Sequence, residues 1–142
     1  YGCQALMNLA AEDDANQKAI AAKGGIELIL TAMKTHAGHA RVQYEGCGAL
    51  RNLAANNDAI AKAVAAKGGI EGIFSAMKTH EDHAGVQDEG CGALWNLAKR
   101  NDADRKAIAA KGGIELILKA MKTHAGHADV QRLGKGALDI LR

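Results

Sequence analysis

Proline is absent from this 142-residue sequence, and aromatic residues make up only 3% of it. With one Trp, one Phe and two Tyr, the core has to be aliphatic, and Ala and Leu are the apolar residues that best favour helices. No apolar run approaches the roughly 18 residues of a membrane span, and no basic stretch precedes an apolar one at the N-terminus, so neither a membrane helix nor a signal peptide is predicted. The 18 basic and 16 acidic residues are too balanced to indicate nucleic acid or an anionic membrane as the main partner.

The sequence repeats itself with a fixed period. Ile26, Ile70 and Ile114 hold the same place in AAKGGIELILTAMKTH, AAKGGIEGIFSAMKTH and AAKGGIELILKAMKTH, which gives an offset of 44 residues (70 − 26 and 114 − 70). The same offset relates Cys3, Cys47 and Cys91; Asn8, Asn52 and Asn96; and Gln43, Gln87 and Gln131. A period in the forties is typical of stacked helical repeats, in which each unit contacts only its neighbours.

Each unit is predicted to contain three helices. In the middle unit the first helix is expected over 58–67 and the second from about Ile70 to about His80, and the third helix of the preceding unit is expected over 39–54. Asp14, Asp58 and Asp102 are the predicted N-caps of the first helices. The glycine pairs that follow, at 24–25, 68–69 and 112–113, end these helices, because glycine readily adopts the left-handed C-cap conformation.

The third helix has two faces. At 100° per residue, one side collects the core residues Val42, Gly46, Ala49, Leu50 and Leu53. The opposite side carries Arg41, Tyr44, Glu45, Gly48, Arg51 and Asn52. One face is therefore expected to build the core, and the other to be available to a partner. Glycine inside a helix costs roughly 0.5–1 kcal/mol, and for the inward Gly46 we expect a close approach of two helices.

The runs EGCGALRNLA and EGCGALWNLA resemble the end of the third helix of armadillo repeats, which reads Ala-Leu-x-Asn-Ile/Leu-Ala. The order of first helix, glycine turn, second helix and third helix is also similar. The resemblance covers essentially the whole chain and implies an all-α fold, a right-handed α-solenoid of three-helix repeats. It implies a single domain over 1–142, with a partial third helix at 1–11, repeats at 12–55 and 56–99, and a cap-like C-terminal repeat at 100–142.

In armadillo proteins the third helices line a concave groove, where the asparagine hydrogen-bonds the backbone of an extended peptide. The resemblance therefore implies that Asn8, Asn52 and Asn96 bind peptide, and an amide, which both donates and accepts, suits that role. The importin-type tryptophan one turn earlier is replaced by Gln4, Gly48 and Gly92, so importin-like recognition of basic nuclear signals is not expected.

The residue before each asparagine varies instead: Met7, Arg51, Trp95 and, in the last unit, Asp139. Arg51 and Trp95 are the predicted specificity residues, because Trp and Arg are enriched in binding hot spots. Glu45 and Glu89 are expected to give the groove local negative charge. Gly48 and Gly92 are also assigned to the groove, where they either deepen a channel for the ligand backbone or are merely tolerated.

The two ends of the array differ from its middle. In the last unit Ile140, Lys135 and Leu133 replace Asn, Cys and Glu, and residues 127–142 are interpreted as a cap with a polar outer face. The first helix, in contrast, is expected to begin at Tyr1 without its first turn. This uncapped N-terminal end indicates either a fragment of a longer array or self-association through that end.

Three His-x-x-His pairs lie between second and third helices, at 36/39, 80/83 and 124/127. His80 and His83, with Glu81 and Asp82 between them, are weak metal candidates, since structural zinc needs four ligands. Histidines at helix ends are the favoured interpretation, so no metal and no cofactor is predicted. The cysteines are expected to stack about 10 Å apart, beyond the roughly 7 Å of a disulfide. Buried free thiols indicate the cytoplasm or the nucleus.

The sequence does not indicate an enzyme. It has five Ser and Thr residues, none in a nucleophile motif, and its glycine pairs join helix to helix rather than strand to helix, unlike phosphate-binding loops. The leading hypothesis is a protein–protein interaction scaffold that binds an extended peptide segment of another protein along the groove of third helices. The alternative is a structural, self-assembling or engineered repeat array with no ligand of its own.

Overall fold

The computed structural model describes residues 2–12 and 14–142, and Tyr1, where the sequence places the start of the first helix, lies outside them. The described residues form ten helices and no strand. These are α1 (Gly2–Glu12), α2 (Asp14–Ala22), α3 (Gly25–Thr35), α4 (Ala40–Leu53), α5 (Asp58–Ala66), α6 (Gly69–Thr79), α7 (Ala84–Arg100), α8 (Asp102–Ala110), α9 (Gly113–Thr123) and α10 (Ala128–Leu141). Within this part of the chain, no helix is both long and apolar enough to span a bilayer.

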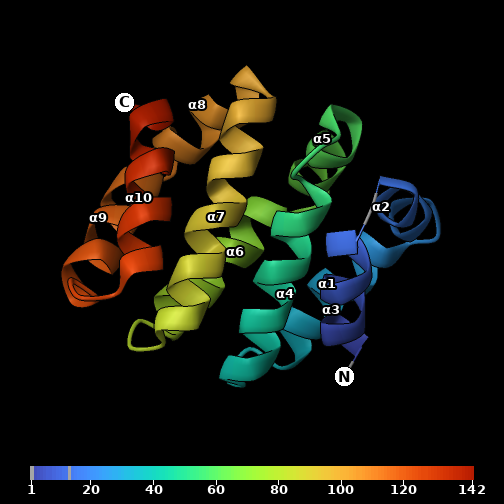
Figure 1. Cartoon of the computed structure of the whole chain (residues 1–142), viewed down its shortest axis with the longest axis horizontal. Helices are drawn as coiled ribbons and strands as arrows, with labels where there is room; N and C mark the ends of the chain where they lie inside the picture. The colour runs from blue at the N-terminus through green and yellow to red at the C-terminus, as the bar shows by residue number, and fades with distance from the viewer. Residues whose placement is uncertain (1, 13) are drawn as a thin grey trace.

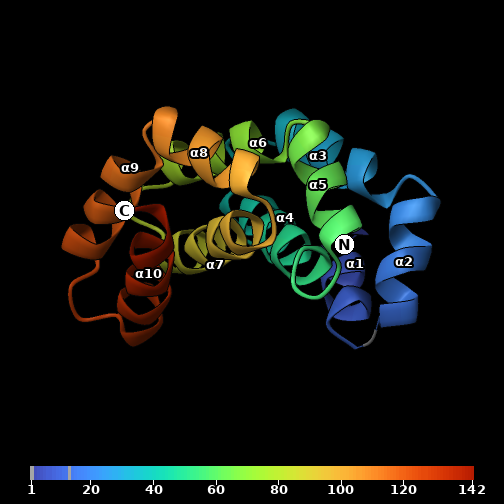
Figure 2. The ribbon, with the colours of Figure 1, turned by 90° about the horizontal axis from the view of Figure 1, so that it is seen from above.

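The helices stack as successive units of three, α2–α4, α5–α7 and α8–α10, with α1 preceding them (Figure 1). The third helices of the units pack in series, α1 on α4, α4 on α7 and α7 on α10. Seen from above, these four helices form the inner side of an arc, and the first and second helices form its outer side (Figure 2). The all-helical, repeat-like part of the prediction is thus confirmed, while the handedness and the family of the stack stay predictions.

The N-caps of α5 and α8 lie one residue before the predicted caps. The Oδ1 atom of Asn57 accepts a hydrogen bond of 3.0 Å from the backbone N–H of Ile60, and Asn101 does the same for Asp104. The prediction that Asp58 and Asp102 are N-caps is therefore wrong. Each aspartate is the first residue inside its helix, where its negative charge favours the helix dipole.

The glycine pairs have the conformation expected of them. The first glycine of each pair is left-handed, with φ of 81° to 95°. The second glycine packs against the backbone: a Cβ on Gly69 would lie 2.6 Å from the carbonyl oxygen of Val64. Both positions therefore require glycine, and the pair sets the sharp turn between the first and second helices.

The core is aliphatic and contains one close helix–helix approach per unit. The side chains of Ile29, Leu50, Ile73 and Leu94 are fully buried. A Cβ on Gly46 would lie 2.5 Å from Cγ of Met33, and the copies of this glycine meet the copies of this methionine in the same way. The interpretation that Gly46 allows a close approach is confirmed.

A buried glutamine ties the second helix of each unit to the third. Nε2 of Gln43 donates to the carbonyl oxygens of Met33 and His36, both at 2.9 Å, and Gln87 and Gln131 repeat the arrangement. The last carbonyls of a helix have no partner within it. The glutamine therefore gives the Met33 carbonyl a partner and adds a second one to the His36 carbonyl, which also accepts from the N–H of His39, and it links the two helices.

Candidate protein-binding surface

The four third helices present one continuous surface on the inner side of the arc, which we call the inner surface (Figure 2). The residues assigned to the groove from the sequence belong to three of these helices, α1, α4 and α7. Their exposure and their partners differ from one position to the next.

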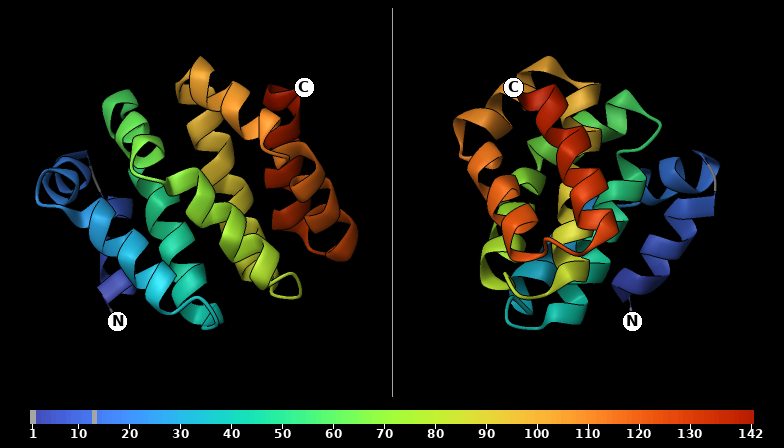
Figure 3. Two further views of the ribbon diagram at one scale, coloured as in Figure 1. Left: turned by 180° about the vertical axis from the view of Figure 1, so that it is seen from behind. Right: turned by 60° about the vertical axis from the view of Figure 1, so that its left-hand side comes forward.

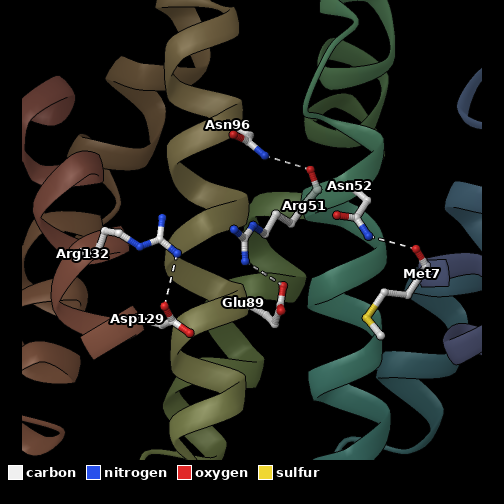
Figure 4. A network of polar contacts seen from close by, with 7 residues as sticks. All are labelled: Met7, Arg51, Asn52, Glu89, Asn96, Asp129 and Arg132. Atoms are coloured by element: carbon white, nitrogen blue, oxygen red, sulfur yellow. Dashed lines mark hydrogen bonds and ion pairs between the residues drawn. The ribbon is translucent and has the colours of Figure 1, made fainter. Parts of the chain in front are cut away.

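The asparagines form a ladder between neighbouring third helices. Nδ2 of Asn52 donates to the carbonyl oxygen of Met7, and Nδ2 of Asn96 donates to that of Arg51, each at 2.9 Å (Figure 4). One amide N–H of each side chain is thus used inside the protein, a role that the sequence did not predict. Both side chains are partly exposed, and no described residue hydrogen-bonds to their Oδ1 atoms. Asn8 is exposed.

The variable residue before each asparagine lies over a glycine of the next third helix. A Cβ on Gly48 would lie 2.3 Å from Sδ of Met7, and a Cβ on Gly92 would lie 2.7 Å from Cδ of Arg51. Both glycines are buried. The assignment of Gly48 and Gly92 to the floor of an open groove is therefore wrong, because the preceding helix covers them with a side chain.

Trp95 lies over the third glycine of this series. A Cβ on Gly136 would lie 2.7 Å from the indole ring of Trp95. Nζ of Lys99 lies 5.5 Å from the centroid of the same ring. The indole is partly buried, so it is less exposed than the sequence suggested. The ring lies at the junction of α7 and α10, with the Lys99 cation over it.

The two glutamates behave differently. Glu45 is 5% exposed and pairs with Arg41 at 2.5 Å, so the expectation that it charges an open groove is wrong. Glu89 lies 3.3 Å from the Arg51 guanidinium, and the two side chains are 16% and 28% exposed (Figure 4). Burial raises the pKa of Glu89, and the charge of Arg51 opposes that rise. Arg51 therefore touches both Gly92 and Glu89 and joins α4 to α7.

A carboxylate that sequence reasoning missed lies next to Glu89. Asp88 is partly buried, and its pKa is raised from 3.8 to about 6, first by burial and then by the charge of Glu89. Its equivalents 44 residues away are Tyr44 and Arg132, so this acidic group belongs to one unit only. The signal in the sequence was the pair of adjacent acidic residues on the face expected to be available.

The paired histidines act as helix ends. His80 is the C-cap of α6 and His83 the N-cap of α7, where Nδ1 of His83 accepts a 3.1 Å hydrogen bond from the N–H of Val86. Nε2 of His80 donates to the carbonyl oxygen of Ala37, one unit earlier, at 2.8 Å. Among the residues that the structure describes, no three His, Cys, Asp or Glu side chains converge as metal ligands would.

The cysteines are free and buried, as predicted. Burial raises the pKa of the Cys91 thiol to about 12 and that of Cys47 further. Since the thiolate is the reactive form, these side chains are packing residues and not nucleophiles.

Fold and surface together define an all-helical, repeat-like protein. The chain matches no protein-family model and no curated protein. Two solved structures, both crystal structures of engineered proteins from the Northeast Structural Genomics Consortium, are similar over 98% of the chain at 30% identity, with TM-scores of 0.85 and 0.84. The chain spans 54% of the first engineered protein and 32% of the second.

Proposed function

We propose that the chain is a protein-interaction scaffold of the armadillo type, and that its inner surface binds an extended segment of another protein. The observation that carries the proposal is the asparagine ladder. Each of Asn52 and Asn96 is held in one orientation by a bond to the neighbouring helix and retains an amide oxygen that no described residue occupies. Equivalent amides at regular spacing suit a ligand whose backbone repeats.

The spacing of the ladder fits a peptide. Neighbouring helices pack about 8–10 Å apart, and an extended chain advances about 3.3 Å per residue. Successive asparagines would therefore meet backbone N–H groups roughly three residues apart along the ligand. The side chains between them, Arg51 with Glu89 and Trp95 with Lys99, would supply specificity. Buried free thiols favour a reducing compartment, the cytoplasm or nucleus, for such a complex.

The test begins with an unbiased pull-down using the intact array, followed by affinity measurement with the partner recovered. Asn52→Ala with Asn96→Ala should weaken binding at least tenfold, since two backbone contacts are lost. Trp95→Ala should weaken it as well. Asn56→Ala, in the exposed loop between α4 and α5, is the matched control and should change nothing. Circular dichroism checks that each variant is folded, and equal affinity of the double variant and the control would refute the proposal.

A second candidate, an end-to-end array with no ligand of its own, is favoured by the two end units. Leu28 on α3 and Leu118 on α9 are 64% and 44% exposed. Leu28, with Leu6 and Leu9, lines a mainly apolar hollow of about 260 Å³ between α1, α2 and α3. Both similar solved structures are engineered proteins, which also favours an array built without a natural ligand.

The charges at the two ends are complementary. Ion pairs between units recur with the repeat: Lys67 with Glu27 at 2.9 Å, and Lys111 with Glu71 at 2.5 Å. The next members of this series, Glu115 at one end and Lys23 at the other, would pair between two copies. That register shifts the second copy by three whole units and superimposes its α1 on α10 of the first. The copies can therefore join in register only if one of these two helices moves aside.

Light scattering over a range of concentrations tests this candidate. The wild type should self-associate as concentration rises, Lys23→Glu and Glu115→Lys should each reduce the mass, and the double reversal should restore it. A wild type that stays monomeric throughout excludes the array and leaves the peptide-binding proposal standing, because the asparagine variants test a different surface.

A further inference from the structure

A cavity of about 340 Å³ lies between α3 and α6, on the outer side of the arc and away from the inner surface. These helices lie side by side when the molecule is seen from behind (Figure 3, left, light blue and yellow-green). Leu30 and Met33 contribute the apolar part of its lining, and Lys34, Lys67 and Glu71 contribute charged groups. The volume falls within the range of sites that hold small organic molecules.

The equivalent place between α6 and α9 is filled. There Leu116 is 9% exposed, and Lys119 forms a 2.6 Å ion pair with Glu81. The residual cavity among these side chains has a volume of about 10 Å³. The two interfaces belong to nearly identical units, so the second is an internal control for the first.

Four residues of the cavity lining are smaller than their equivalents in the second interface. At an offset of 44 residues, Ala37 stands in place of Glu81, Gly72 in place of Leu116, Ser75 in place of Lys119, and Leu30 in place of Phe74. The ion pair and the leucine side chain that fill the second interface are therefore all missing from the first. All four smaller residues line the cavity.

The charges around the cavity select the occupant. Lys67 is paired with Glu27 and Glu71 is paired with Lys111, so these four charges compensate one another. Lys34, in contrast, has no ion-pair partner among the described residues. The site thus combines an apolar floor with one uncompensated positive charge.

We infer that this cavity binds a small amphiphilic anion, with its apolar body on Leu30 and Met33 and its carboxylate or sulfonate beside Lys34. The ligand would occupy the space that Leu116 and the ion pair of Lys119 with Glu81 fill in the second interface, between α6 and α9. This inference is independent of the peptide-binding proposal, because no residue of the inner surface takes part in it.

Sodium octanoate, kept below its micelle concentration, is the probe, and titration calorimetry is the measurement. The wild type should bind one octanoate saturably. A variant that copies the second interface, Leu30→Phe with Ala37→Glu, Gly72→Leu and Ser75→Lys, should bind at least tenfold more weakly. It should keep its thermal stability, because the same four side chains already pack in the second interface. Octylammonium should bind at least tenfold more weakly than octanoate.

Two further variants keep the test decisive if the quadruple variant does not fold. Lys34→Gln removes only the charge and should weaken octanoate binding several-fold while leaving the circular dichroism spectrum unchanged. Gly72→Leu alone should also weaken it, since a Cβ there already lies 3.2 Å from Cδ2 of Leu30. Absence of saturable heat in the wild type, equal binding of octanoate and octylammonium, or unchanged binding by these variants would overturn the inference.

Discussion

Asp88 should make the stability of the protein depend on pH in a direction opposite to that of most carboxylates. Burial and then Glu89 raise its pKa from 3.8 to about 6; Asp129 adds to the rise, while His127 and Arg51 oppose it. The folded protein therefore binds a proton on this group more tightly than the unfolded chain does. Between about pH 4 and pH 6 the free energy of unfolding should fall as pH rises, since ionisation of Asp88 is costly only in the folded state.

The size of the effect follows from the pKa change. A rise from 3.8 to about 6 corresponds to about 3 kcal/mol if taken at face value. Asp88 is only partly buried, and solvent screens such interactions, so we expect about 1–1.5 kcal/mol. Asp88→Asn, which cannot ionise, should therefore be more stable than the wild type by that amount at pH 7.5, and equally stable near pH 4.

Urea denaturation followed by circular dichroism, at several pH values from 4 to 8, measures this difference. Comparison of the variant with the wild type at each pH removes the contribution of all other groups. Asp82→Asn, in the exposed loop between α6 and α7, is the matched control for the loss of one carboxylate. A difference between Asp88→Asn and the wild type that stays constant across the range would refute the reasoning.

Three other predictions concern the repeated packing. Gln87→Leu should lower the free energy of unfolding by about 1–3 kcal/mol in urea, because the buried carbonyl of Met77 loses its hydrogen bond, while that of His80 keeps the one from the N–H of His83. Cys91 should react with a thiol reagent at pH 8 no faster than the protein unfolds, since burial raises its pKa to about 12, and labelling as fast as free cysteine would contradict this. Gly90→Val should destabilise by about 2–3 kcal/mol, because a Cβ there lies 2.6 Å from Sδ of Met77, whereas Gly126→Val, with open space around it, should show little change by the same assay.

The period and the glycine pairs were enough to predict the helices closely. Helix α5 ends one residue before the predicted end, and α4 lies one residue inside both predicted bounds. These boundaries depend on local chemistry, a left-handed glycine or a capping side chain, which a sequence displays directly. The displaced cap at Asn57 was the exception, because Asn and Asp are adjacent there and both are good caps.

The details of the inner surface depend on contacts that the sequence of one helix does not contain. Gly48 lies on the outward side of α4 by periodicity, yet Met7, from the preceding third helix, covers it. Glu45 is buried for a similar reason, and the raised pKa of Asp88 depends on groups from α4, α7 and α10. Helix periodicity predicts which way a side chain points, but the neighbouring unit decides whether solvent reaches it.

The bonds from asparagine and histidine side chains to the backbone of the preceding unit span a fixed number of residues: 45 for the asparagine ladder and 43 for the histidines that reach the preceding loop. Tandem duplication or deletion of one complete 44-residue segment in the gene would therefore re-form every one of these bonds with a different neighbour. Insertion of a single residue within a helix would disrupt them locally. Such a molecule can change its length readily only by whole 44-residue repeats. The side chains at each interface between repeats, such as Gly72 between α3 and α6, can still change independently of the other interfaces.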